Sequence, residues 1–206
     1  MSRTFDPADR VIVKATSFTS EIAPQLVPPG SAALLMYVAP SAYLENILAG
    51  DASRQELQQL AGSRLARLTR RLGEPPAHLW ELKEGERAAL GWACEMASMI
   101  AAADRLEQSR WCDFDRFLAT PASELVAIAG HFGHQRDADS ASRLCSGPIM
   151  GRYSKAPEHQ YSPRLRQDVL AQSRAQNKAS IRDGMAWLDR MGGRYAVIGQ
   201  ALEKAG

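Results

Sequence analysis

The stretch Arg10–Val38, RVIVKATSFTSEIAPQLVPPGSAALLMYV, decides how the chain is interpreted, because it holds two aliphatic runs on either side of a turn-rich segment. Arg10–Ala15 is a short β-branched run that ends in small polar residues, and it predicts a buried strand. Ala32–Val38 is a continuous apolar run of strand length, which is typical of parallel sheets covered on both faces, although periodicity alone does not exclude a helix. Between them, Thr16–Val27 predicts a turn and a short helix that ends at Pro28-Pro29-Gly30. The pattern favours an α/β fold.

Most of the remaining chain is predicted to be helical. The leucine spacing over Ser53–Leu72 marks an amphipathic helix, and a longer one is expected over Glu84–Gln108. Arg110–Phe114 predicts a third strand. Other helices are expected at Ser41–Ala49, from Pro121 to near Gly130, from Pro163 to a break at Gly192-Gly193, and beyond that break, whereas Asp137–Ser162 is expected to be turn-rich. Three strands are few for a parallel sheet in a chain of 206 residues, so the sheet is expected to be incomplete.

Length and composition limit the possible classes of protein. With 206 residues, 45% apolar and 23% charged, residues 1–206 are expected to form a single domain of ordinary globular composition. The net charge of +2 gives no reason to expect nucleic-acid binding. The least polar stretch, Leu90–Ala103, is too short to span a bilayer and is interrupted by Glu95. An unpaired sheet edge would favour association, so a homo-oligomer is possible.

The three cysteines are widely spaced and form no C-x-x-C pair: Cys94, Cys112 and Cys145. This pattern suggests neither a disulfide framework nor a zinc ribbon, and it fits a reducing cytoplasm. Cys94 lies on the apolar face of a predicted helix together with Trp92 and Met96, and all three are expected to be core residues.

Several motifs, in order along the chain, resemble the P-loop sulfotransferase-like family. The pairing of RVIVKATSFTSEIAPQLV with LLMYVAPSAYLENILAG is similar to the family's strand ending in Lys-Thr-His, its following helix, and a strand of the Tyr-Val-Ala-Arg-Asn-Pro type. Cys112–Gly133, CDFDRFLATPASELVAIAGHFG, is similar to a strand with Tyr-Glu-Asp-Leu, a proline, and a helix ending in Phe-Leu-Gly. Gly147–Ser162 lies where the family has a basic, glycine-containing loop near the nucleotide.

The resemblance implies a P-loop NTPase-like three-layer fold with a small parallel sheet and many helices. The chain contains no G-x-x-x-x-G-K-[ST], so it would correspond to the part of such a protein that follows the first strand and the glycine-rich loop. The implied reaction is transfer of a sulfuryl group from 3′-phosphoadenosine 5′-phosphosulfate, as co-substrate, to a hydroxyl or amine acceptor, without a metal. The expected partner is a small-molecule or nucleotide ligand.

The resemblance also implies roles for individual residues. Lys14 matches the family's lysine at the strand end, and Thr16 stands at the position of its histidine base. Asn46 falls near the phosphate-binding serine, and Arg152 and Lys155 belong to the basic loop. These five residues are therefore the candidates for catalysis (Lys14, Thr16) and for binding the nucleotide (Asn46, Arg152, Lys155).

The chain departs from the family's pattern at two chemically important positions. A threonine hydroxyl at Thr16 has no useful basicity near neutral pH and cannot replace a histidine base. The arginine that pairs with the 3′-phosphate is replaced by Val38 or by Pro40, depending on the alignment. Both departures replace a basic or charged side chain rather than a side chain needed for packing. They favour, as an alternative, a non-catalytic binding or interaction protein on a degraded form of this fold.

Other charged and polar residues have simpler structural interpretations. Glu21 could replace the missing base, but a glutamate near a helix N-terminus that interacts with the helix dipole is the more common case. His131 and His134 lack a third ligand at zinc-like spacing, so no metal site is predicted. Asp113 and Asp115 are expected to cap a helix or form salt bridges. Four arginines are expected to form a solvated basic helix face: Arg64, Arg67, Arg70 and Arg71.

Overall fold

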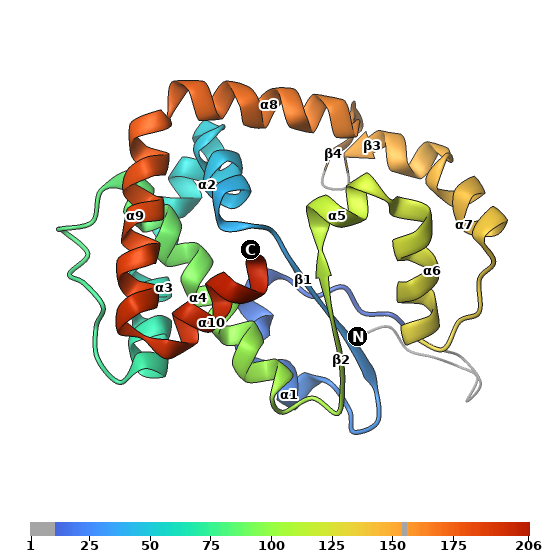
Figure 1. Ribbon diagram of the computed structural model, residues 1–206, viewed down its shortest axis with the longest axis horizontal. Helices are drawn as coiled ribbons and strands as arrows, with labels where there is room; N and C mark the ends of the chain where they lie inside the picture. The colour runs from blue at the N-terminus through green and yellow to red at the C-terminus, as the bar shows by residue number, and fades with distance from the viewer. Residues whose placement is uncertain (1–10, 154–155) are drawn as a thin grey trace.

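The computed structural model describes residues 11–153 and 156–206 and shows a mostly helical protein around a small parallel sheet (Figure 1). The elements of its first half are η1 (Ser17–Ile22), α1 (Ala23–Leu26), β1 (Ala32–Tyr37), α2 (Pro40–Leu48), α3 (Asp51–Leu72), α4 (Glu84–Ala103) and β2 (Gln108–Asp113). Those of the second half are α5 (Phe114–Ala119), α6 (Pro121–His131), α7 (Ala138–Cys145), η2 (Pro148–Gly151), β3 (Arg152–Tyr153), β4 (Ala156–Gln160), α8 (Pro163–Gln176), α9 (Lys178–Arg194) and α10 (Ala196–Ala205).

The sheet consists of β1 and β2, which pair in parallel with Leu35 opposite Trp111 and Tyr37 opposite Asp113. The two strands predicted at Ala32–Val38 and Arg110–Phe114 are therefore confirmed to within a few residues. A parallel pair needs a long crossover connection, which α2, α3 and α4 provide here. The mixed α/β class is confirmed, with a parallel sheet of two strands.

The strand predicted at Arg10–Ala15 is wrong over residues 11–15, which form no strand. The side chains of Val11, Ile12 and Val13 are 45%, 67% and 76% exposed. A β-branched run becomes a strand only where it pairs with a neighbour and buries at least one face. β1 is paired with β2 instead, and residues 11–15 precede η1 as exposed chain without regular secondary structure.

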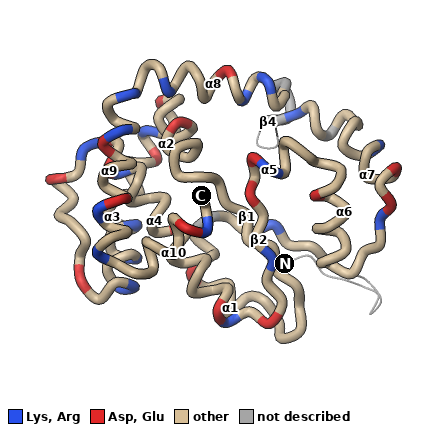
Figure 2. Tube along the Cα trace, in the orientation of Figure 1, with Lys and Arg blue, Asp and Glu red and all other residues tan. Residues whose placement is uncertain are grey.

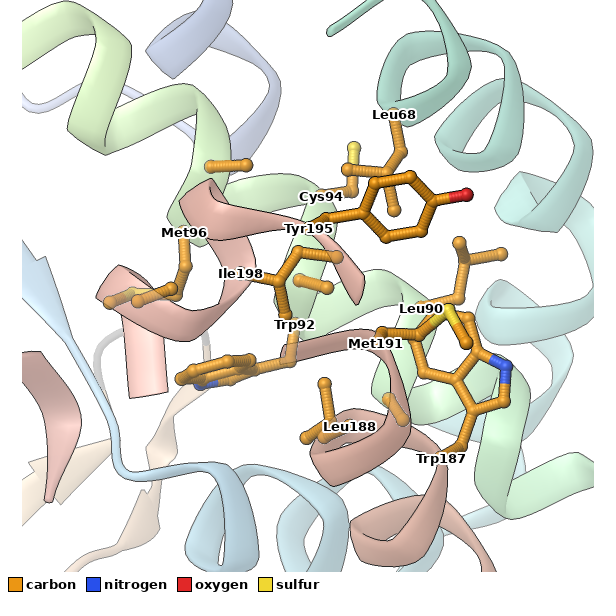
Figure 3. Packing of buried hydrophobic residues seen from close by; sticks show 14 of the residues in the cluster. Leu68, Leu90, Trp92, Cys94, Met96, Trp187, Leu188, Met191, Tyr195 and Ile198 are labelled. Carbon is orange, nitrogen blue, oxygen red and sulfur yellow. The ribbon is translucent and has the colours of Figure 1, made fainter. Parts of the chain in front are cut away.

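The main hydrophobic core forms around α4, which packs against α3, α9 and α10. Leu90, Trp92 and Met96 of α4 are at most 2% exposed, and they meet Leu188 of α9 and Ile198 of α10, both fully buried. In Figure 3 these side chains point toward one another from helices that are far apart in the sequence. The core roles predicted for Cys94, Trp92 and Met96 are confirmed.

Burial also controls the chemistry of two of the cysteines. Burial raises the pKa of the Cys94 thiol to about 11, and burial together with nearby Glu124 raises the pKa of the Cys112 thiol. Because the thiolate is the reactive form, both should resist modification at neutral pH, whereas Cys145 is only half-buried. We expect a disulfide-exchange reagent to modify one thiol of the native protein rapidly and all three after unfolding in urea. Rapid reaction of Cys94 in the native protein, identified by peptide mass, would contradict the packing described here.

The predicted break before a terminal helix is confirmed to within two residues, because α9 ends at Arg194, just after Gly192-Gly193, and α10 begins at Ala196. A Cβ on Gly192 would lie 2.7 Å from a Leu202 methyl carbon, so this glycine allows close contact with α10 rather than ending a helix. A further break, at Asn177, divides the helix predicted from Pro163 onward into α8 and α9, and the Asn177 side-chain amide donates to the carbonyl of Leu48 on α2.

α5, α6 and α7 form a second group on the other side of the sheet from α3 and α9, and α8 runs between the two groups (Figure 1). The helix predicted from Pro121 is α6, with Pro121 in its first turn. The ring Nε2 of His131, at the end of α6, lies 3.0 Å from the carbonyl oxygen of Ala33, which ties α6 to β1. The segment predicted as turn-rich, residues 137–162, contains α7 and the β3–β4 pair as well as turns.

Candidate functional site

The carboxyl ends of β1 and β2 lie at the same edge of the sheet, and each is followed at once by a helix. The carbonyl of Val38, just beyond β1, accepts a hydrogen bond of 2.9 Å from the indole N–H of Trp92. α2 then begins at Pro40, and the first bond of the helix runs from the amide of Tyr43 to the carbonyl of Ala39. The amides at the start of α2 lack intrahelical acceptors and carry a positive partial charge, whereas those at the start of α5 are already bound by the Asp113 carboxylate.

The acidic residues at this edge have structural roles. The Asp113 carboxylate accepts hydrogen bonds from the amides of Asp115 and Arg116, at 2.7 and 3.2 Å, and so caps α5. Asp115 forms an ion pair of 2.7 Å with Arg166 of α8. The predicted capping and salt-bridge roles of these two aspartates are confirmed. Arg166 also lies over the ring of Phe114, with 5.4 Å between the guanidinium carbon and the ring centroid.

An aromatic pair lies on the face of the sheet that meets α10. The rings of Tyr37 and Trp111 meet edge to face, 5.9 Å apart, and the Lys204 ammonium lies 5.3 Å from the centre of the Trp111 ring. The Tyr37 hydroxyl donates to the carbonyl of Lys204 at 3.1 Å. Burial and the nearby Asp113 carboxylate raise the pKa of Tyr37, so the phenol stays protonated at neutral pH and is a donor rather than a base.

The structure does not bring the predicted site residues together. Lys14 and Thr16 are exposed in the chain that leads into η1, Asn46 is exposed on α2, and Arg152 is exposed on β3. In the described part of the chain, no hydrogen bond or ion pair joins any two of these four. Lys155 lies outside the described residues. On α2, the neighbour of Asn46 is the residue that points inward: Glu45 is buried and accepts 2.6 and 3.0 Å hydrogen bonds from Arg174 of α8.

A second group of polar residues, which we call the arginine cluster, lies where η1 covers α3 and α4. It consists of Phe18, Ser20 and Glu21 of η1, Arg64, Arg67 and Arg70 of α3, and Glu95 and Ser98 of α4. The side chains of Arg64 and Arg67 are only 4% and 7% exposed. The prediction of a solvated face is therefore wrong for these two arginines, whereas the Arg70 side chain is 62% exposed.

Arg67 is the centre of the cluster. Its Nε lies 2.5 Å from a Glu21 oxygen, one Nη lies 2.7 Å from a Glu95 oxygen, and the other Nη donates to the Ser98 hydroxyl at 3.4 Å. The Ser20 hydroxyl donates to the second oxygen of Glu95 at 2.9 Å. A buried cation is tolerated only when its donors have such partners. Burial by itself would lower the pKa of Arg67, but the hydrogen bonds to Glu95 and Glu21 raise it overall.

Glu21 connects the cluster to solvent. One carboxylate oxygen contacts Arg67, and the other lies 2.8 Å from an Nη of Arg70. The hydrogen bond from Arg70, against the opposing effect of burial, lowers the pKa of Glu21, so this carboxylate is charged at neutral pH. Its role is ion pairing to two arginines, rather than catalysis or interaction with a helix dipole.

Arg64 is the least satisfied member of the cluster. Its guanidinium carbon lies 5.9 Å from the centre of the Phe18 ring, and that of Arg67 lies 4.7 Å from the same ring. Among the residues that the structure describes, Arg64 forms one ion pair, at 3.5 Å, to Glu56, which is 61% exposed. Its Nε is buried and has no hydrogen-bond partner within the described residues.

Two signals in the sequence could have revealed this cluster. Arg64 continues the spacing of the buried residues Leu57, Ala61 and Leu68 on α3, so it falls on the apolar side of the helix. Glu95 likewise interrupts the apolar face of α4. A positive and a negative charge on the buried faces of two adjacent helices predict an ion pair between them.

The comparisons with protein-family profiles, with curated proteins and with solved structures find no match. Within the described residues, no cluster of histidine, cysteine or acidic side chains is arranged to hold a metal ion. No helix in the same residues is both long and apolar enough to cross a bilayer. Positive and negative residues are interspersed along the trace in Figure 2. The geometry of the sheet edge and of the arginine cluster is therefore the basis of any functional proposal.

Proposed function

We propose that the chain has a sulfotransferase-like fold of the P-loop NTPase type, and that it binds the adenosine bisphosphate part of 3′-phosphoadenosine 5′-phosphosulfate at the carboxyl edge of β1 and β2. The observation that carries the proposal is the parallel pairing of these two strands, each followed directly by a helix. In open α/β sheets, ligands bind beyond the carboxyl ends of the strands, where the amides of a following helix can contact phosphate groups.

The local order of elements supports the same proposal. The chain has an aliphatic strand before Pro40 and a helix after it, and Cys112–Gly133 contains the end of β2 followed by α5 and α6, an order compatible with the resemblance. Arg152, within the glycine-containing loop, is exposed and able to contact a ligand. Lys14 and Thr16 precede η1 in exposed chain instead of ending a strand, so the proposed site does not include them.

Sulfuryl transfer requires more than binding. The bond between sulfur and the leaving phosphate oxygen breaks as the acceptor oxygen or nitrogen bonds to sulfur, and the acceptor proton must pass to a base. Thr16 is not basic, and Tyr37 at the sheet edge is a protonated donor. The groups described at this edge can therefore orient and bind an anionic nucleotide, but they do not supply the base.

The test is calorimetric titration of the purified chain with adenosine 3′,5′-bisphosphate. We expect saturable binding, and binding at least about tenfold weaker for adenosine 5′-monophosphate, because each charge-assisted contact to a phosphate is worth a factor of this order. Arg152→Gln should weaken binding of the bisphosphate, whereas the matched control Arg143→Gln, an exposed arginine at the end of α7, should not. Equal affinity for the two nucleotides, or no binding of either, would rule out the proposed site.

A second candidate function is that of a non-catalytic interaction protein. Two observations favour it: the run Val11, Ile12 and Val13 is exposed, and the parallel sheet has two strands in the described part of the chain. Exposed β-branched residues and open strand edges favour association with another chain. The calorimetric titration with adenosine 3′,5′-bisphosphate separates the two functions, because a non-catalytic interaction protein is expected to show no saturable binding of this nucleotide.

A further inference from the structure

The segment formed by η1 and α1, residues 17–26, is attached to the protein mainly through polar contacts. α1 has no buried residue, Ile22 and Leu26 are 48% and 51% exposed, and the third large apolar side chain of the segment, Phe18, is half-buried beside guanidinium groups. The specific contacts to the helices below are made by Glu21, Ser20 and Phe18 within the arginine cluster. Little apolar area is lost from contact if this segment moves away, so its attachment depends on the ion pairs.

Beneath the segment, the arginine cluster has more donors than the segment satisfies. Both oxygens of Glu21 are used, one by Arg67 and the other by Arg70. Arg64 lies against the same Phe18 ring and receives nothing from Glu21, and its buried Nε has no partner within the described residues. The segment thus supplies one carboxylate, which pairs with Arg67 and Arg70, while Arg64 shares the Phe18 ring with Arg67 and pairs with the exposed Glu56.

We propose that the arginine cluster is a binding site for a tetrahedral oxyanion of the sulfate or phosphate-monoester class, and that Glu21 occupies this site when the ligand is absent. A carboxylate offers two oxygens, whereas sulfate offers four, enough to contact Arg67 and Arg70 and still reach Arg64. Guanidinium groups match such ligands well because their planar, forked donors bind two oxygens at once. When the ligand enters, Glu21 leaves, and Phe18 moves away from the two buried guanidiniums with the rest of η1.

This site is separate from the sheet edge and does not rest on nucleotide binding there. It is built from η1, α3 and α4, and neither Arg152 nor the start of α2 belongs to it. Failure of bisphosphate binding at the sheet edge would leave this proposal intact, and the reverse also holds.

The test uses the full chain, with sodium sulfate as the probe at constant ionic strength and calorimetry as the readout. Glu21→Gln removes the competing charge and keeps the shape, so sulfate should bind at least about tenfold more tightly than to the unmodified protein. Arg70→Gln, an exposed position that leaves the buried pair intact, should weaken binding at least about fivefold through loss of one charged donor. The matched controls are Glu74→Gln and Arg71→Gln, which lie outside the cluster and should leave the sulfate affinity unchanged.

Proteolysis reports the displacement of the segment. Chymotrypsin cleavage after Phe18 should become faster when sulfate is added to the unmodified protein, and it should already be fast in Glu21→Gln. Titration with glycerol phosphate distinguishes the two sources of the anion, since a phosphate-monoester site binds it at least as well as inorganic sulfate. Unchanged sulfate affinity in Glu21→Gln, an equal loss in Arg70→Gln and Arg71→Gln, or cleavage that does not respond to sulfate would each overturn the proposal.

Discussion

Replacing Gly85 by alanine is expected to lower the free energy of unfolding by about 3 kcal/mol, the upper end of the range for overpacking a core. Gly85 lies in the first turn of α4, and a Cβ at this position would overlap the backbone carbonyl of Ser180 on α9. On the facing helix, a Cβ on Gly184 would lie 2.5 Å from the carbonyl oxygen of Gly85. Both obstacles are backbone atoms, so they can be relieved only by moving the two helices apart, which opens the core around Leu188.

The measurement is urea denaturation followed by circular dichroism, and the chain supplies a matched control in Gly62. Gly62 lies in the interior of α3, and nothing lies within 4 Å of a Cβ placed on it. Gly62→Ala should therefore raise the free energy of unfolding by about 0.5–1 kcal/mol, because alanine loses less backbone entropy in a helix. A Gly85→Ala protein as stable as the unmodified one would show that α4 and α9 do not approach as closely as described.

The sequence predicts those elements whose pattern is local. Ala32–Val38 and Ser53–Leu72 form the expected strand and helix because a continuous apolar run and a leucine stripe are periodic signals in themselves. Arg10–Ala15 carries an equally good strand pattern but forms no strand over its described residues, because a strand also requires a partner. The single helix predicted from Pro163 onward is divided at Asn177 for a similar reason, since the Asn177 side chain bonds to Leu48 of α2, which is distant in sequence.

The residues of the candidate site show the same contrast between local patterns and contacts that are distant in sequence. The roles of Asp113 and Asp115 follow from residues within a few positions and from one helix that packs nearby, and they could be predicted. The arginine cluster joins three elements, and the burial of Arg67 depends on η1 covering it. A charge on a helix is normally solvated, so composition alone gives the wrong environment for Arg64 and Arg67 unless the apolar stripe of α3 is followed residue by residue.

Arg67→Met is expected to destabilise the protein by about 3 kcal/mol, the lower end of the range for removing one partner of a buried ion pair. Methionine has a similar length and can fill the space, so the loss comes from the carboxylates and not from a cavity. Glu95, whose side chain is 12% exposed, would be left charged without its guanidinium partner, and Glu21 would keep only Arg70. The same substitution at Arg70, which is 62% exposed, should cost no more than about 1 kcal/mol, as is usual for surface pairs.

A double substitution identifies the cause of the loss. If the unpaired carboxylate is responsible, Glu95→Gln in the Arg67→Met background should restore about half or more of the lost stability, because a neutral amide is far less costly to bury than a charge. Glu95→Gln alone should be destabilising, since Arg67 then loses its inner partner. Additive losses in the double variant would mean that Arg67 stabilises the fold through its aliphatic stem and its contact with Phe18 rather than through charge. The Arg67 guanidinium contacts both Glu95 of α4 and Glu21 of η1. Arg67→Met should therefore also speed chymotrypsin cleavage after Phe18. Faster cleavage would show that the same side chain stabilises the core and holds η1 in place.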